Sequence, residues 1–300
     1  MTEAERAALA NDNDLLKELL LRRMPEPGKR ATAVEGLFMS RRESDEHVEN
    51  CFYRPSVGLV VQGNKRSIVG TDEYCYGENQ CLVVSVDMPS SFFASGATRE
   101  RPFLAVSLDL DTPLLARLAM ELPPAAGLPQ APHRGVAVTD ATPDLLNAFL
   151  RLVRILDKPE EAPFIAPIVV REIHCWLLMG PLGATLRRFG TYGTQGNQIA
   201  RAIAWLRDNY KEPLQVEALA RKVNMGTSTF HRHFKEVTSL SPLQYHKRLR
   251  LYEAQRLMLA GSADAASAGL AVGYESPTQF NREYKRMFGE PPRRDVMRRR

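Results

Sequence analysis

The sequence predicts an α+β protein of two domains, with a β-barrel and flanking helices in the N-terminal part and an all-α domain at the C-terminal end. Its 300 residues, 44% of them apolar, are enough for two domains of about 100–200 residues each. Short apolar runs separated by turn residues follow one another from residue 31 to residue 110, which is typical of a β-sandwich or barrel. From residue 197 onward the periodicity is helical, and one pattern occurs twice.

The composition predicts a cytoplasmic protein. The N-terminus is acidic and polar without an apolar stretch of secretory length, and nowhere do about 18 apolar residues follow one another, so no membrane association is expected. The cysteines show neither CxxC spacing nor density, so we expect reduced thiols and no disulfide framework, metal site or cofactor. The cysteines are Cys51, Cys75, Cys81 and Cys175.

Residues 1–30 are predicted to form an N-terminal arm or helix, because four leucines keep a helical period before a stretch with prolines and a glycine. Barrel strands are expected within residues 31–121, in the runs SVGLVVQ, KRSIV, CLVVSV and FLAVSLDL. Glycine-containing turns separate several of these runs, as in a chain of short antiparallel strands. The four leucines are Leu15, Leu16, Leu19 and Leu20.

Two helices are expected within residues 142–190, which would complete an effector or dimerisation domain at residues 31–190. Thr142 followed by Pro143 is a helix cap with a first-turn proline, and a second helix is expected from Pro167 to Met179. Their apolar stripes either pack on the barrel or form a dimer seam, and both alternatives stay open. The first stripe comprises Leu145, Leu146, Phe149, Leu152, Val153 and Leu156.

The linker GTYGTQGN at residues 190–197 marks the expected boundary to a basic domain at residues 197–300. This domain has 19 Lys/Arg against 10 Asp/Glu, a net charge of +9, whereas the other residues have a net charge of −4. Such asymmetry points to an anionic partner for the basic part, and duplex DNA is the commonest one. A solvated basic surface is the alternative.

The basic domain contains a near-duplication, VNMGTSTFHRHFK and VGYESPTQFNREYK, in which Phe230 and Phe280 stand in equivalent positions. Each copy has the first helix, tight turn and second helix of a helix-turn-helix unit. Asn224 and Gly273 occupy the turns, where the backbone must be left-handed. Between the copies, Ser241 caps a helix of about 19 residues, roughly 28 Å long, which is close to the ~34 Å between successive major-groove entries.

The polar face of each second helix is the predicted DNA-binding surface, because its side chains donate hydrogen bonds to phosphates or base edges. Arg232 and Arg282 either read guanine in the major groove or make phosphate contacts or salt bridges. For His231 and His233, packing or phosphate contact is favoured over a metal or proton-switch role. The predicted DNA-binding residues are Ser228, Thr229, His231, Arg232, Lys235, Thr278, Gln279, Asn281, Arg282 and Lys285.

Residues 198–294 resemble the DNA-binding domain of the AraC/XylS family of bacterial regulators, whose paired helix-turn-helix units end in a pattern found here from Gly273 to Pro292. Residues 31–121 resemble the cupin-like N-terminal half of one AraC subgroup. The resemblance implies a transcription regulator, an activator that recruits RNA polymerase. The sequence departs from the family at Ala265, Ala268 and Gly269, where larger apolar residues are usual, which predicts a second unit of marginal order without DNA.

The barrel is predicted to bind a small-molecule effector and to mediate homodimerisation. Residues 31–125 contain one histidine, His47, outside any metal-ligand spacing, and no nucleophile triad or phosphate-binding glycine loop is present. An enzyme is therefore not expected. The inward set of strand residues, Val57, Leu59, Val61, Leu82, Val84 and Val86 or their alternates, predicts a closed apolar pocket for a weakly polar or electrophilic compound.

The candidate effector-binding residues are Val61, Val84, Cys75 and Cys81, the two cysteines being either thiol sensors or buried apolar groups. The barrel-side helices and the 190–197 linker are the expected relay between the domains. Two rival hypotheses remain: a DNA-binding protein without effector whose barrel only dimerises, and an enzyme fused to a DNA-binding domain.

Overall fold

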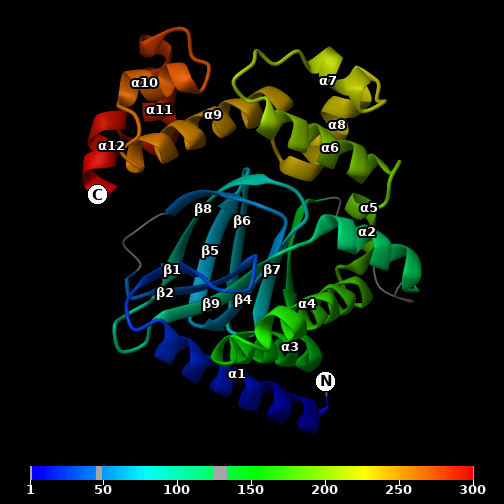
Figure 1. Ribbon diagram of the computed structural model, residues 1–300. Coiled ribbons are helices and arrows are strands. Elements are labelled where there is room, and N and C mark those ends of the chain that lie inside the picture. The colour runs from blue at the N-terminus through cyan, green and yellow to red at the C-terminus, as the bar shows by residue number, and fades with distance from the viewer. Residues whose placement is uncertain (1, 45–48, 124–133, 300) are drawn as a thin grey trace.

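The computed structural model describes residues 2–44, 49–123 and 134–299, which form a β-rich half and a helical half (Figure 1). The strands are β1 Gly28–Ala31, β2 Leu37–Arg42, β3 Glu49–Tyr53, β4 Ser56–Gln62, β5 Asn64–Val69, β6 Asp72–Gly77, β7 Gln80–Val84, β8 Met88–Ser95, β9 Phe103–Asp109 and β10 Val136–Asp140. The helices of this half are α1 Glu3–Arg23, α2 Thr112–Glu121, α3 Pro143–Arg154, α4 Ala162–Met179 and α5 Gly183–Gly190, with a 3-10 turn at Ile155–Asp157.

The strands form two antiparallel sheets, in the orders β1-β2-β9-β4-β7-β10 and β3-β8-β5-β6. In the larger sheet, Leu59 of β4 pairs with Cys81 of β7 and with Val106 of β9. No described strand of one sheet pairs with a strand of the other, so the predicted barrel is an open sandwich of two sheets. The α+β fold with a β-rich N-terminal domain and a helical C-terminal domain is confirmed.

The strand β4 shows how the larger sheet divides its two faces. Successive side chains of a strand point to opposite faces. Val57, Leu59 and Val61 lie in the core with the N-terminal helices, whereas Val60 lies in the core between the sheets. The first-named inward set of β4, Val57, Leu59 and Val61, therefore points away from the interior of the sandwich. The alternate set, which contains Val60, points into it.

Helices α1 and α3 cover the outer face of the larger sheet, below the sheets in Figure 1. Thr2 and Glu5 form a capping box at the start of α1, and the Thr142 side chain accepts from the Leu145 N–H at the start of α3. The predicted stripe is buried on α3, and its last member, Leu156, is half-buried in the 3-10 turn that follows. Packing on the sheet is thus the role of this stripe, and it is not a surface seam.

Helix α4 begins at Ala162, five residues before the predicted start, and Pro167 lies inside it. The helix forms despite the missing amide of Pro167 because Ala162, Ala166 and Val169 are buried in the core. It is long and apolar enough to span a membrane by length and composition alone, but it packs beside α3 in the core of the β-rich half. The other described helices do not meet that test.

The C-terminal half consists of helices (Figure 1). The first of them begins at Gln195, two residues before the predicted boundary, and Thr194 caps it by accepting from the Asn197 N–H. The helix that connects the two copies has the predicted cap, where Ser241 and Gln244 form a capping box. The helices are α6 Gln195–Asp208, α7 Val216–Lys222, α8 Thr227–Thr238, α9 Pro242–Leu259, α10 Ala265–Ala271, α11 Pro277–Phe288 and α12 Pro292–Arg299.

The hydrophobic cores do not follow the predicted domain boundary. Buried residues of α6, α7 and α8, among them Ile199 and Phe230, belong to one contiguous cluster with the sandwich residues Val84 and Met88. Residues of α10, α11 and α12 form a separate cluster around Phe280. The first helix-turn-helix unit is therefore part of the sandwich core, and the second is joined to it through α9.

Candidate functional site

Helices α7 and α8 form the first helix-turn-helix unit, called the first unit below. Asn224 adopts the predicted left-handed conformation in the turn, with φ 58°. Phe230 and Phe234 of α8 are fully buried, and their rings lie 5.5 Å apart. Because these residues stand four apart on one helix face, the opposite face of α8 is left to solvent.

Helices α10 and α11 form the second helix-turn-helix unit, the second unit below. Gly273 is left-handed in its turn, with φ +90°, as predicted. Gly269 of α10 packs closely against α11, because a Cβ there would lie 3.0 Å from the Phe280 ring. The Phe280 ring therefore takes the space that a larger side chain at position 269 would fill.

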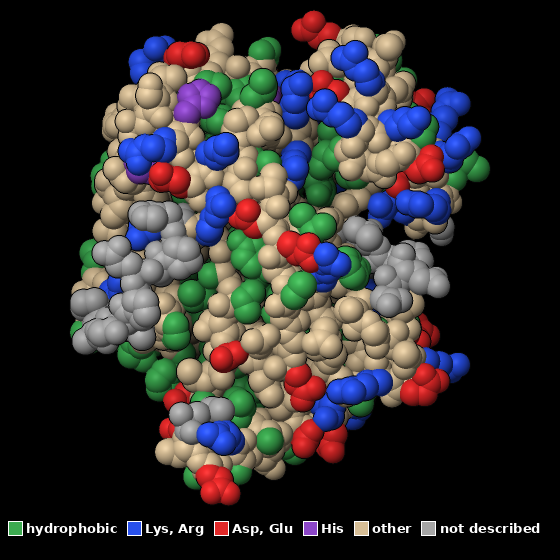
Figure 2. Space-filling view, turned by 180° about the vertical axis from the view of Figure 1, so that it is seen from behind, with side chains coloured by type: hydrophobic (Ala, Val, Ile, Leu, Met, Phe, Trp, Pro, Cys, Tyr) green, Lys and Arg blue, Asp and Glu red, His purple; other side chains and the backbone are tan. Residues whose placement is uncertain are grey.

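The predicted DNA-binding residues lie on the outer faces of α8 and α11. All ten are exposed except Thr229, which is half-buried. Figure 2 shows Lys and Arg side chains gathered over the helical half, in agreement with its net positive charge. The two faces are joined by α9, whose 18 residues span about 27 Å.

The two arginines predicted to read bases have different surroundings. Arg232 forms an ion pair with Glu236 at 3.4 Å, and its Nη2 lies 3.2 Å from His233 Nε2. The Glu236 carboxylate also lies 2.8 Å from His233 Nδ1, so one carboxylate holds both side chains. Arg282 has no comparable ion pair within the described part of α11. The spacing of Arg232 and Glu236, four residues apart on a helix, is a signal readable in the sequence.

Gln279 of the second unit is tied to a buried carboxylate that sequence reasoning missed. Its side chain donates to Glu283 at 3.3 Å, and Glu283 also accepts from Lys247 and Tyr274, each at 2.9 Å. Burial raises the pKa of Glu283, but the bonds from Lys247, Tyr274 and Gln279 together lower it below its ordinary value. This network fixes α11 on α9 and orients Gln279.

A cavity of about 410 Å³ lies between the two sheets. Of the four candidate effector-binding residues, Val84 lines this cavity, whereas Val61 and Cys81 face the other core and Cys75 is exposed on β6. Burial raises the pKa of the Cys81 thiol to about 12, which keeps it neutral and unreactive.

The lining of this cavity is more charged than expected. It includes the basic residues Lys29, Arg42, Arg54 and Lys65, with Asp109 as the acidic one. These charged residues lie outside β4 and β7. The prediction of a weakly polar ligand was based on the apolar alternation of those two strands alone. Most of the lining is apolar, as expected, but the charged side chains correct the expectation that only a weakly polar ligand fits this cavity.

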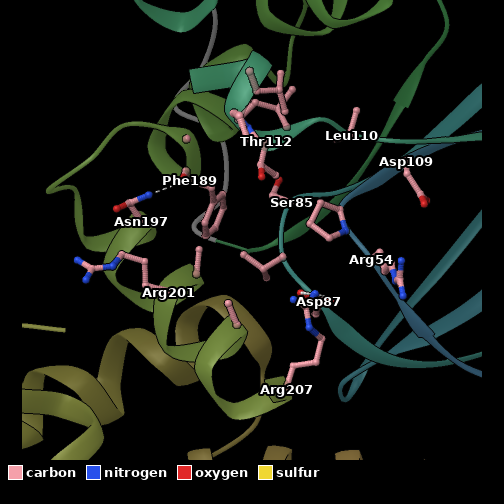
Figure 3. Close-up of a pocket in the computed structure, with 18 residues that line it drawn as sticks. Arg54, Ser85, Asp87, Asp109, Leu110, Thr112, Phe189, Asn197, Arg201 and Arg207 are labelled. Atoms are coloured by element: carbon pink, nitrogen blue, oxygen red, sulfur yellow. Dashed lines mark hydrogen bonds and ion pairs between the residues drawn. The ribbon is translucent and has the colours of Figure 1, made fainter. Parts of the chain in front are cut away.

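A second cavity, of about 510 Å³, lies where the sandwich meets α5 and α6 (Figure 3). Asp87 of the sandwich and Arg207 of α6 face each other there, with Arg207 Nη1 3.1 Å from both carboxylate oxygens. Burial raises the pKa of Asp87, and Arg207 opposes this rise. The Tyr245 hydroxyl donates to the Asp87 carbonyl at 2.7 Å, so α6 and α9 both bind one sandwich residue.

Residues 33–185 match the family of AraC-type transcriptional regulator N-termini, and residues 219–298 match a helix-turn-helix domain family. The first match covers more than half of the chain. The chain belongs to the AraC family of transcription regulators.

Curated relatives in the AraC family match about half of the chain. The transcriptional activator RhaS of Escherichia fergusonii is 27% identical over 148 residues, which is 49% of this chain and 53% of RhaS. RhaS of Pectobacterium atrosepticum is 25% identical over 142 residues, 46% of this chain and 47% of that protein. The chain thus spans about half the length of the curated relatives that it matches.

Solved structures of ToxT from Vibrio cholerae share the fold of this AraC-family chain. An apo ToxT structure aligns with a TM-score of 0.56 at 7% identity, over 89% of this chain and 99% of ToxT. ToxT bound to an unsaturated fatty acid aligns with a TM-score of 0.52 over 89% of this chain and 96% of ToxT, also at 7% identity. At this identity the likeness concerns the arrangement of sandwich and helices alone.

Proposed function

We propose that this chain is a sequence-specific transcription regulator that binds double-stranded DNA with α8 and α11 in successive major grooves. The observation that carries the proposal is the pair of exposed polar faces on α8 and α11, joined by the single helix α9, which is about 27 Å long. The net charge of +9 within residues 197–300 supplies attraction to phosphates. The ten residues predicted from the sequence are the proposed contacts.

Selection of bound sequences from a random pool of duplex DNA tests this proposal on the full chain. We expect enrichment of two short motifs about 10 base pairs apart, which is one turn of B-DNA. Affinity for the enriched site should fall steeply as salt rises, since bound phosphates release counterions. Failure to enrich any sequence, with binding that does not depend on salt, would reject the proposal.

The cavity between the sheets is the proposed effector site, and its chemistry favours an anionic amphipathic molecule. Lys29, Arg42 and Lys65 supply positive charge, while Val60 and Phe103 supply apolar surface. The volume of about 410 Å³ lies within the usual range for small-molecule sites. One structural neighbour, ToxT, has been solved with an unsaturated fatty acid bound, which agrees with a carboxylate ligand.

Oleate is a suitable probe for this site because it joins a carboxylate to an apolar chain. We expect oleate to raise the Tm of the full chain, and Lys65→Met to weaken this effect, since Lys65 lies over the Phe92 ring at the cavity wall. Lys17→Met on α1 is the matched control, and oleyl alcohol the uncharged control ligand. An equal effect of alcohol and acid would reject a carboxylate-binding site, and no effect of either favours the rival hypothesis of a sandwich that serves only dimerisation.

The outer face of α4 is the proposed homodimer interface. Phe164 is 75% exposed and Ile168 is 64% exposed, beside a groove of about 750 Å³ that Pro163 and Ala166 line. A second copy fits this surface, because a two-fold axis lets each Phe164 lie against the groove of the other chain. Single exposed apolar residues are common, but two on adjacent turns beside an apolar groove favour burial in an interface.

The remaining assignments follow from the family. The matched RhaS proteins are transcriptional activators, so we propose activation with RNA polymerase as partner, in the cytoplasm. The relatives are regulators and not enzymes, and we propose no catalytic activity. Among residues 2–44, 49–123 and 134–299 no group of three or more His, Cys, Asp or Glu residues is placed to hold a metal ion.

A further inference from the structure

The C-terminal end of α8 is capped by the sandwich. Arg134, just before β10, donates from Nη1 to the Lys235 carbonyl at 3.1 Å and to the Glu236 carbonyl at 3.0 Å. The Gly135 N–H donates to the Val237 carbonyl at 3.0 Å. The last carbonyls of a helix lack partners within the helix and carry partial negative charge, so a guanidinium placed there stabilises the last turn.

Arg134 is itself held in position from the sandwich side. Its Nε lies 3.0 Å from an oxygen of Asp72 at the start of β6. The next carbonyl, that of Gly135, accepts from the Ser85 N–H at 2.7 Å, and a Cβ at Gly135 would lie 2.7 Å from Val86 Cγ2. The donor is therefore fixed against two strands before it contacts α8, and it is not a flexible surface arginine.

The capped turn carries the carboxylate that orients a proposed base-reading residue. The Glu236 carbonyl accepts from Arg134, while the Glu236 carboxylate lies 3.4 Å from Arg232 Nη1 and 2.8 Å from His233 Nδ1. Through Glu236, the position of the α8 backbone is coupled to the direction of the Arg232 side chain. If the last turn of α8 loosens, Glu236 no longer holds Arg232 in one orientation.

We propose that Arg134 is a positioning residue for DNA recognition, which caps α8 from the sandwich and thereby fixes Glu236 and the direction of Arg232. The inference rests on the proposed DNA-binding function. The α11 end is joined to the sandwich differently, through Tyr252 of α9, whose ring lies 5.6 Å from Phe288 and 5.9 Å from Phe52 of β3. Base discrimination by the first unit therefore depends on the cap that Arg134 provides.

The test compares Arg134→Ala, Arg134→Lys and Glu236→Gln in the full chain, with Arg99→Ala as the matched loss of an exposed sandwich arginine. Base preferences are measured at every position of the enriched DNA site. We expect Arg134→Ala and Glu236→Gln each to lose about tenfold of the discrimination at the same base pair, in the part read by α8. The double variant should lose little more than either single one, because both act on Arg232.

A merely structural role would weaken all positions alike, so loss confined to one base pair and partial rescue by Arg134→Lys support positioning. Unchanged preferences in Arg134→Ala, or additive losses in the double variant, overturn the proposal. Amide hydrogen exchange in the last turn of α8 is measured in parallel and should be faster in Arg134→Ala than in Arg99→Ala. If the wild-type chain enriches no DNA sequence, the proposed function fails, and equal exchange in the two variants then rejects the cap as well.

Discussion

Arg232 and Lys235 lie on the same face of α8, but their expected roles differ. Both side chains are exposed, but Arg232 is held by Glu236, whereas Lys235 bears a flexible ammonium group. A planar guanidinium held in one direction suits bidentate contact with guanine, and a flexible ammonium suits a phosphate.

Arg232→Ala should lower the affinity for the enriched site by about 1–3 kcal/mol and relax the preference at one base pair. Lys235→Ala should weaken binding to all sequences alike and reduce the salt dependence. Equilibrium binding to the enriched site and to single-base variants, at several salt concentrations, measures both effects. Identical profiles for the two variants would show that α8 is not the reading helix.

His246 of α9 predicts a pH dependence of stability. It is buried, its Nε2 has no hydrogen-bond partner among the described residues, and burial, with the nearby Arg250 charge, lowers its pKa to about 4. The folded-state pKa lies below the unfolded value of about 6.5, so the unfolded chain binds the proton more readily. Stability is therefore present in full above about pH 6.5 and is lost as the pH falls toward 4.

Unfolding of the wild type and of His246→Leu between pH 4 and pH 7.5 checks this expectation. The wild type should lose about 3 kcal/mol more than the variant across this interval, since each unit of pKa shift is worth about 1.4 kcal/mol. Parallel stability curves for the two chains would contradict a buried neutral imidazole.

The β5–β6 hairpin connects the cavity between the sheets to the first unit. Lys65 of β5 and Tyr76 of β6 line the cavity, while the hairpin tip contacts the end of α8. There the Thr71 N–H donates to Ser239 Oγ at 2.8 Å, and Arg248 donates to the Gly70 carbonyl. One element therefore touches both the proposed effector site and the reader, in addition to the relay expected at the 190–197 linker.

Gly70→Ala should separate the hairpin tip from α8. A Cβ at Gly70 would lie 2.3 Å from both Ser239 Oγ and the Thr238 carbonyl oxygen, and the residue has φ +62°. Gly96 is the matched control, because it has φ +68° but nothing within 4 Å of an added Cβ. Urea unfolding should show Gly70→Ala less stable than Gly96→Ala by about 1–3 kcal/mol. Equal losses would mean that backbone strain alone acts at both sites.

The exposed face of α4 predicts self-association at the scale of one helix. The double variant Phe164→Ser, Ile168→Ser should shift the full chain from dimer to monomer in sedimentation experiments at tens of micromolar. Leu243→Ser on α9, where the leucine is also about half exposed, is the control and should leave the association unchanged. A wild-type chain that is monomeric with and without DNA would reject the interface.

At the scale of the whole molecule, the two helix-turn-helix units differ in what supports them. The first unit shares a core with the sandwich, and the second packs on its own cluster around Phe280 and Tyr284. A small separate core buries less apolar surface, so its opening free energy is lower.

Native-state hydrogen exchange should show α10, α11 and α12 opening at lower free energy than α6 and α8. Addition of the enriched DNA site should slow exchange in α11 more than in α8, because the less stable unit gains more order on binding. Simultaneous opening of both units with the sandwich would show instead that α9 transmits stability along its whole length.

The sequence by itself determined the elements whose signals are local. The turns at Asn224 and Gly273, the cap at Ser241 and the buried pair Phe230 and Phe280 were all predicted, and the structure has them as predicted. Such features depend on contacts within a few residues or on helical period, so a single chain contains enough information. The family resemblance, which rests on the same motifs, was confirmed for the same reason.

Only the tertiary structure decided which face of β4 points inward. A strand alternates its side chains between two faces, and on β4 both faces bear apolar residues, Val57 and Leu59 on one and Val60 on the other. It also decided that basic side chains from other strands line the cavity between the sheets. The contact of Arg134 with the end of α8 joins residues 101 positions apart, and no periodicity or cap in the sequence encodes such a distance. Long-range contacts of this kind arise when separate elements pack on one core, and here that core merges the sandwich with the first unit.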